Sequence, residues 1–255
     1  MSDFVDHRSI VRAIWGDSDL ILLIFAGAAA EFALNRAVDW LFFTNRLPDD
    51  PIGRFFSTVR YAQEIVFADE TRARRTLDRI SAIHRSVERR RGERIPAWAH
   101  RDVLYMLIDY SERAHRLLHR PLTATEQQDL YAVFRRVGAG LHVPELPPDY
   151  AAWRADRERH LGRDLAYSDS TARLYAQYRR QLGAWRYALL LQVQALLAPR
   201  QVRRLLRLEP CPVLACALWA FGLCDLPGLR GLAYRLLLPA RYLDEVRQVE
   251  RMGVA

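Results

Sequence analysis

Histidine is the residue type best suited to bind a metal or move a proton near neutral pH, and His84 has an unusual position in this sequence. Its helix, expected over residues 70–91, has an apolar face, into which His84 projects between Leu77 and Ile80. A buried imidazole needs partners for its ring nitrogens, because an unsatisfied buried polar group costs about 1–3 kcal/mol. Two interpretations follow: a core histidine bonded to a neighbouring carbonyl or hydroxyl group, and an iron ligand on a rigid helix beside an apolar cavity.

A second polar group lies on the preceding helix, expected from Pro51. Arg54, Thr58 and Tyr61 are spaced by four and then three residues, so they share one stripe of that helix. The stripe borders an apolar arc made by Phe55, Phe56, Val59, Ala62 and Val66. Polar groups at the margin of a buried surface can hold the charged edge of a ligand, and arginine in particular pairs with carboxylates.

The first long apolar segment also carries polar residues, Glu31 and Asn35, one helical turn apart. A carboxyl group in an apolar setting has a raised pKa, which would suit Glu31 for acid–base chemistry. Gly27 and the alanines at positions 28–30 indicate close approach by another body, either a second helix or a cofactor. Both possibilities are kept open here.

Other metal patterns are incomplete. Glu112 and His115 form one E-x-x-H pair, half of what a di-iron carboxylate bundle needs, and His119 follows one turn later. These histidines come in the last turns before Pro121, where we expect an exposed helix end. The sequence contains no glycine-rich phosphate loop, G-x-S-x-G elbow or H-E-x-x-H zinc signature.

Composition narrows the class of protein. The chain has 255 residues, 51% of them hydrophobic, which is enough for one full-sized core. Its net charge is +8, but all 38 basic residues are arginine and many alternate with acids, as in Arg154–Arg159. We interpret this pattern as pairing on helix faces and predict no nucleic-acid partner. The three cysteines, Cys211, Cys216 and Cys224, are expected to be buried small hydrophobic residues in a reducing compartment.

Helix signals occur along the whole sequence, and strand alternation is almost absent. We predict one all-α domain over 1–255, with helices from Asp17 or Ser18 to just before Pro48, from Pro51, from Glu70 to Gly92, and from Pro96 to Pro121. Thr123 and Glu126 have the spacing of a capping box for a helix to about Val137. Residues 141–150 are expected to be irregular, followed by helices over 151–161, 171–182 and 184–197 and from about Ala240. The longest apolar run, Leu20 to Ala30, is too short to cross a bilayer, and a cytoplasmic location is expected.

Several of these segments resemble one known family. Arg54-x-x-x-Thr58, the segments IVFAD and AIH ending at His84, and the stretch from Arg120 to Trp153 are similar to the shared core of the MpaB-type oxygenases and rubber oxygenases, also called latex clearing proteins. The resemblance covers about residues 15–199 and leaves a helical C-terminal extension over 200–255.

The resemblance implies an all-α oxygenase that holds haem b in a central apolar pocket and uses dioxygen to oxidise an apolar substrate, in known members by cleaving isoprenoid double bonds. His84 falls on the family's iron-ligating histidine, and Arg54 and Thr58 fall on its arginine and threonine near the haem. Tyr61 and Asn35 are expected to line the cofactor, and Glu31 is the candidate distal acid or base. Ser57 stands where studied rubber oxygenases have a lysine, and the tryptophan–histidine segment of a later helix is replaced from Asp102 onward.

An alternative from another class is a non-catalytic helical protein. The segment Pro199–Pro210 places arginines beside leucines, and Trp219 and Phe221 follow. A basic amphipathic stretch of this kind can dock on an anionic membrane surface or on a partner protein. The same pattern also arises when leucines pack inward and arginines are solvated.

Overall fold

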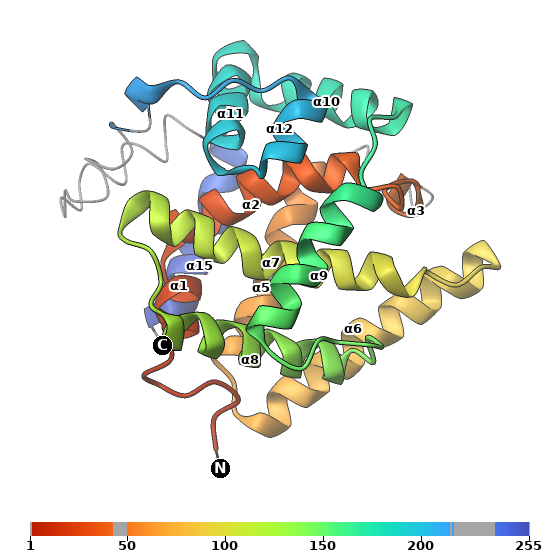
Figure 1. Cartoon of the computed structure of the whole chain (residues 1–255), viewed down its shortest axis with the longest axis vertical. Coiled ribbons are helices and arrows are strands. Elements are labelled where there is room, and N and C mark those ends of the chain that lie inside the picture. The colour runs from red at the N-terminus through yellow and green to blue at the C-terminus, as the bar shows by residue number, and fades with distance from the viewer. Residues whose placement is uncertain (1, 43–49, 215, 217–237, 255) are drawn as a thin grey trace.

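The computed structural model describes residues 2–42, 50–214, 216 and 238–254. Within these ranges all regular structure is helical, and the pairing of extended backbone is limited to two isolated bridges, Asp3 with Asp69 and Asn35 with Leu165. The all-α prediction is therefore confirmed. Figure 1 shows α2 and α7 running through the middle of the molecule, with α10, α11 and α12 beyond α2 and with α6 and α8 on the opposite side.

Helices account for most of the described residues. Their bounds are α1 Ile10–Gly16, α2 Ser18–Leu34, α3 Asp39–Phe42, α5 Pro51–Val66, α6 Glu70–Arg91, α7 Ala97–Leu118, α8 Ala124–Gly140, α9 Tyr150–Arg163, α10 Asp169–Leu182, α11 Ala184–Leu197, α12 Arg200–Leu206 and α15 Leu243–Val254, which is preceded by a 3-10 turn at Ala240–Tyr242.

Local capping chemistry explains most of the helix starts. The carboxyl groups of Asp50 and Asp69 accept backbone N–H groups at the first turns of α5 and α6. Thr123 and Glu126 form the predicted capping box at α8. Gly92 ends α6 with φ at +77°, a left-handed conformation that glycine adopts without a Cβ clash.

Three boundaries differ from the sequence-based prediction. The first long helix ends at Leu34, because Asn35 takes an extended backbone and its side-chain oxygen accepts the N–H of Ala37. A separate helix, α1, precedes α2 and meets it at an angle of 85°. Helix α8 runs on to Gly140, where the glycines were expected to stop it; a Cβ on Gly138 would lie 2.7 Å from Leu104, so this glycine allows close helix packing instead.

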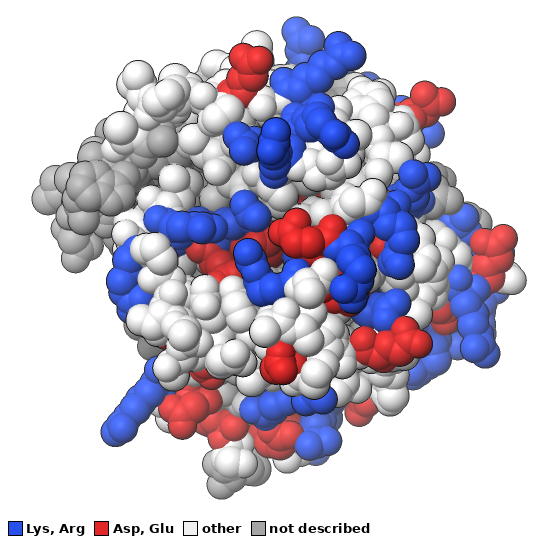
Figure 2. Space-filling view, viewed as in Figure 1, with Lys and Arg blue, Asp and Glu red and all other residues white. Residues whose placement is uncertain are grey.

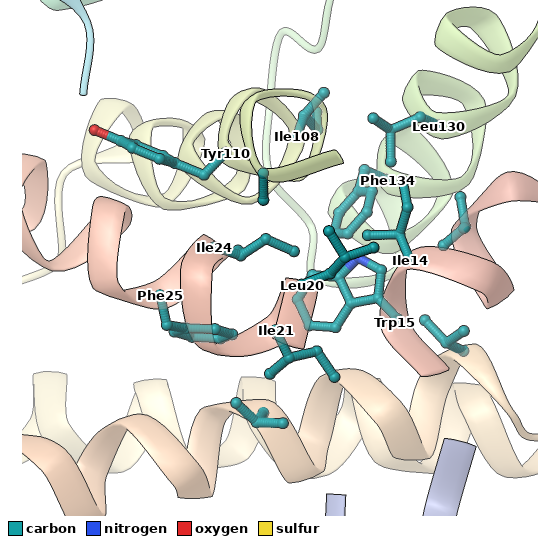
Figure 3. Close-up of a cluster of buried hydrophobic side chains, with 14 of the residues drawn as sticks. Ile14, Trp15, Leu20, Ile21, Ile24, Phe25, Ile108, Tyr110, Leu130 and Phe134 are labelled. Atoms are coloured by element: carbon teal, nitrogen blue, oxygen red, sulfur yellow. The ribbon is translucent and has the colours of Figure 1, made fainter. Parts of the chain in front are cut away.

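The core is centred on α2, which packs most closely against α7. Figure 3 shows Ile24 and Phe25 of α2 in the same cluster as Ile108 and Tyr110 of α7, with Trp15 of α1 beside them. A Cβ on Gly27 would lie 2.5 Å from the Tyr110 ring and 3.1 Å from Leu197 of α11. Helices α7 and α11 therefore pack closely against α2 at Gly27.

Helix α12 packs its apolar side chains against the domain. Val202 of α12 is buried, Leu205 and Leu206 pack against the cluster containing it, and Arg204 is exposed. In this segment the leucines therefore pack inward and Arg204 faces solvent, which is the second of the two alternatives given for it. Residues Trp219, Phe221 and Cys224, which the docking and cysteine predictions included, lie outside the described ranges.

The cysteine prediction was wrong at two positions. Cys211 and Cys216 are both exposed free thiols: α12 ends at Arg207, which has a left-handed backbone, and residues 209–213 that follow are exposed. Their apolar neighbours in the sequence suggested burial, but Val213, between them, is also exposed.

On the face seen in Figure 2, arginine and acidic side chains are interspersed across α7 and α9. No single described helix has the length and apolarity needed to cross a bilayer, although the bent pair α1 and α2 together reaches that length and composition.

Candidate functional site

His84 lies where α5, α6 and α7 come together. Its side chain is half-buried, and its ring lies 5.0 Å from the ring of His100 on α7, measured between centroids. Burial lowers the pKa of His84 to about 4, the nearby His100 and Arg54 lower it as well, and Glu88 one turn along α6 acts in the opposite direction. His84 is therefore a neutral imidazole at neutral pH. Neither of its ring nitrogens makes a hydrogen bond within the described part of the chain.

The stripe of α5 is only partly directed at this junction. Arg54 is half-buried and lies close enough to His84 to influence its charge. Thr58 is exposed, and its hydroxyl donates to the carbonyl of Arg54 at 3.2 Å. Tyr61 lies under the guanidinium of Arg79 at 5.0 Å. The apolar arc beside them is confirmed, with Phe56, Val59 and Val66 buried.

The low pKa of His84 makes folding sensitive to acid. An imidazole has a pKa near 6.5 when the chain is unfolded and about 4 in the fold, so the unfolded state binds the proton first as pH falls. We expect the free energy of unfolding to decrease as pH falls from about 6.5 to about 4, and to decrease less in His84→Leu. Urea titrations across this pH range would measure the difference.

The matched control for that titration is His7→Leu, because the side chain of His7 is 81% exposed. His100 must be followed as well, since burial also lowers its pKa and the two rings adjoin. Equal pH slopes in the wild-type protein and in His84→Leu would contradict the burial of a neutral His84.

Glu31 is held in a buried ion-pair network. The guanidinium of Arg157 on α9 donates to both carboxylate oxygens of Glu31, at 2.5 and 2.6 Å, and to Asp109 of α7 at 2.9 Å. Arg113 reaches the other oxygen of Asp109 at 2.8 Å. Burial raises the pKa of Glu31, as the sequence suggested, while Arg157 opposes that rise. Burial alone would also raise the pKa of Asp109, but Arg157 and Arg113 together lower it.

Asn35 belongs to a second buried cluster. Its side-chain amide donates to Asp102 of α7 at 2.7 Å. Asp102 in turn contacts Nδ1 of His160 on α9, and Asp164, at the end of α9, lies 3.0 Å from the same nitrogen. These oxygen and nitrogen atoms of Asp102, His160 and Asp164 all lie within 4.8 Å of one another, so the three side chains could hold a metal ion.

The structure therefore divides the predicted site residues into two groups. His100, which contacts His84, and Asp102, which contacts Asn35, are two residues apart on α7 and so point about 200° apart around its axis. Arg54 and His84 lie on one side of α7, and Glu31 and Asn35 lie on the other. Within the described residues, Glu31 pairs with Arg157 and Asn35 donates to Asp102, and neither side chain contacts His84.

Glu112 and His115 do not converge on a common metal position. Glu112 accepts the hydroxyl of Tyr150 at 2.7 Å, and Nδ1 of His115 bonds to the carbonyl of Arg120 at 2.8 Å. His115 is buried, whereas an exposed helix end was expected, because the chain turns back at Pro121 and brings that carbonyl over the ring. Each group has its own partner, which does not favour the di-iron alternative.

Arg157 and His160 were not predicted as site residues from the sequence. Arg157 was grouped with the solvated arginines of Arg154–Arg159, and its neighbour Arg159 does form the expected exposed pair with Asp156. A signal for the second residue was present: Asp156, His160 and Asp164 follow at intervals of four, so they share one stripe of α9. The position of Asp102 opposite that stripe could not be read from the spacing.

The comparisons were made against family models and curated proteins. A model of the catalytic domain of the ER-bound oxygenase mpaB/B' and rubber oxygenase family matches residues 13–224. The chain belongs to this family. The match begins within α1, includes α2 to α12, and extends past the segment in which the resemblance was first noted. A comparison with curated proteins gave no match.

The resemblance described in the sequence analysis implies haem, and the His84 side of α7 has donor groups of a suitable kind. A neutral imidazole with unengaged ring nitrogens can coordinate iron, and the neighbouring Arg54 can offset the negative charge of a propionate. The rings of His84 and His100 are too close to take opposite faces of one porphyrin as they stand. The donor groups here are therefore of the kind that a haem would use, with one of the two imidazoles as its ligand.

Proposed function

We propose that this member of the mpaB and rubber oxygenase family is a haem b-dependent oxygenase that oxidises an apolar small molecule, with His84 as the protein ligand of iron. The observation that carries the proposal is the state of His84 within the matched domain. It is neutral at neutral pH, half-buried beside Arg54, and free of hydrogen bonds to the described residues. An isoprenoid with a carbon–carbon double bond is the substrate class that we propose.

Each residue on this side of α7 receives a defined role. When bound, haem b would supply redox-active iron for a reaction with dioxygen. Arg54 would pair with a propionate, and Thr58, bonded to the Arg54 carbonyl, would fix the turn of α5 that presents that arginine. Tyr61 would lie at the outer margin beside Arg79. The proposal treats Glu31 and Asn35 as parts of buried networks and assigns the distal position to neither.

The absorption spectrum of protein expressed with a haem precursor tests this proposal. We expect a Soret band in the wild-type protein and its loss in His84→Ala. His119→Ala is the matched control, because the side chain of His119 is 37% exposed at the end of α7 and lies away from the α6 junction. His100→Ala should keep the band, since His100 adjoins His84 without acting as a ligand in this proposal.

Two results would reject the proposal. If the wild-type protein remains colourless after haem supplementation, it does not bind haem and the proposed cofactor is wrong. A Soret band that survives in His84→Ala and disappears in His100→Ala would move the iron to the other imidazole. Circular dichroism of each variant separates loss of haem from loss of fold.

A further inference from the structure

The two carboxylates that meet His160 converge on one ring nitrogen. Oδ1 of Asp102 and Oδ2 of Asp164, the latter at 3.0 Å, both face Nδ1. This nitrogen carries at most one proton, so it can donate one hydrogen bond and leaves the other carboxylate oxygen without a proton to accept. An ordinary Asp–His–Asp relay would use both ring nitrogens. Here Nε2 faces a third carboxylate, Asp156, at 3.6 Å, which is beyond hydrogen-bond distance.

Burial makes this arrangement of charge costly. Asp102, His160 and Asp164 are 2%, 3% and 4% exposed. Arg163 lies at the surface and bonds to both oxygens of Asp164. Among the described residues, Asp102 has only the neutral amide of Asn35 and the ring of His160 as hydrogen-bond partners. Asp164 therefore has a guanidinium partner, whereas Asp102 is a buried carboxylate without one among the described residues, and a cation bound beside it would stabilise its charge.

We propose that Asp102, His160 and Asp164 bind a divalent first-row transition-metal ion, which takes the place of the Nδ1 proton. The three donor atoms lie within 4.8 Å of one another. Two ligand atoms that each lie about 2.1 Å from one ion are at most about 4.2 Å apart, so small side-chain shifts would bring all three within bonding distance of one ion. One imidazole nitrogen with two carboxylate oxygens favours zinc, manganese, iron or cobalt over calcium and magnesium, which prefer oxygen ligands.

The surroundings supply the outer contacts that such a site uses. The amide of Asn35 fixes Asp102, Arg163 fixes Asp164, and the hydroxyl of Tyr105 donates to Asp156 at 2.7 Å beside the far ring nitrogen. Groups of this kind orient metal ligands, and their loss typically weakens metal binding about 10–100-fold.

The location indicates what the ion does. Asp102 belongs to α7, His160 belongs to α9, and Asp164 follows directly after α9. Asn35 lies in the turn after α2, where Arg36 donates its backbone N–H to the carbonyl of Asp164 at 2.9 Å. The ion would join these three elements on the side of α7 opposite His84. It is thus a structural site separate from the proposed haem ligand, and its occupancy does not depend on the proposed oxygenase chemistry.

Cobalt and zinc titrations of the chelator-treated full-length protein test the site. We expect one Co²⁺ per chain with a visible absorption band, displacement of Co²⁺ by Zn²⁺, and weaker binding in acid, because protons compete with the metal for carboxylate and imidazole donors. Asp102→Asn and His160→Gln should abolish the band, and Asn35→Ala should weaken binding about 10–100-fold. Glu112→Gln is the control, because it makes the same kind of carboxylate-to-amide change outside the cluster.

Several outcomes overturn the inference. The inference is wrong if the wild-type protein shows no cobalt band and no heat of zinc binding by calorimetry. It is also wrong if metal binding persists in both Asp102→Asn and His160→Gln. If a ligand variant fails to fold, wild-type melting with and without Zn²⁺ decides the question together with Asn35→Ala. An unchanged melting temperature then rejects the site. The Soret test on His84 is read separately, so failure of either proposal leaves the other measurable.

Discussion

Replacing Arg157 by methionine should lower the free energy of unfolding by about 3–5 kcal/mol, because it removes the cation that compensates two buried carboxylates. The Arg157 side chain is 2% exposed and holds Glu31 through two hydrogen bonds. Asp109 would keep Arg113, whereas Glu31 would lose its only ion-pair partner among the described residues. Urea unfolding followed by circular dichroism would measure the change.

The control for this substitution lies two residues away on the same helix. Arg159 pairs with Asp156, but its side chain is 68% exposed, so Arg159→Met should change stability by no more than about 0.5 kcal/mol. Similar losses in the two variants would mean that the network around Arg157 is hydrated in solution.

The pH dependence gives this prediction a sign. Burial raises the pKa of Glu31, and Arg157 counteracts it, so the pKa rises further once the arginine is gone. A group whose pKa is raised by folding adds stability at low pH that is lost as pH rises. The loss of unfolding free energy in Arg157→Met should therefore be larger at about pH 8 than at about pH 5. The double variant Arg157→Met/Glu31→Leu, which removes both charges, should recover part of the loss.

Local chemistry made much of the fold predictable from sequence. Asp50, Asp69 and Thr123 start helices through side-chain bonds to backbone N–H groups a few residues ahead, so their effect is visible in a short window. The arc of Phe56, Val59 and Val66 needs only the period of a helix. His84 was identified in the same way, from its place among apolar neighbours on α6.

The remaining features depend on residues that are distant in the chain. The apolar composition around Asn35 favours a continuous helix, but the backbone bonds between residues 34–36 and residues 164–166 end it, and these partners are about 130 positions away. Arg157 resembles Arg159 in sequence and differs only because Glu31 and Asp109 meet it from α2 and α7. For the same reason, Glu31 and Asn35 were grouped with His84 although α7 separates them.

The junction between α1 and α2 was also not predicted from the sequence. A substitution there should have the second large effect on stability. Trp15 is fully buried at the end of α1, with its ring centroid 6.1 Å from that of Phe25 on α2 and 5.7 Å from that of Phe134 on α8. Trp15→Ala should lower the free energy of unfolding by about 3–5 kcal/mol, through lost apolar burial and the cavity that remains. Trp15→Phe should cost less, because the indole N–H has no hydrogen-bond partner among the described residues.

Trp185 is the matched control, since it is 50% exposed at the start of α11 and Trp185→Ala should change stability by no more than about 0.5 kcal/mol. The comparison also bears on the bend itself. Helices α1 and α2 together have the length and composition of a bilayer span, but at 85° they place Trp15 against α8, which a straight span would not do. Denaturant unfolding of the two alanine variants should therefore separate by several kcal/mol if the bend is part of the core. Equal stability of the two variants would mean that Trp15 is not packed between these helices.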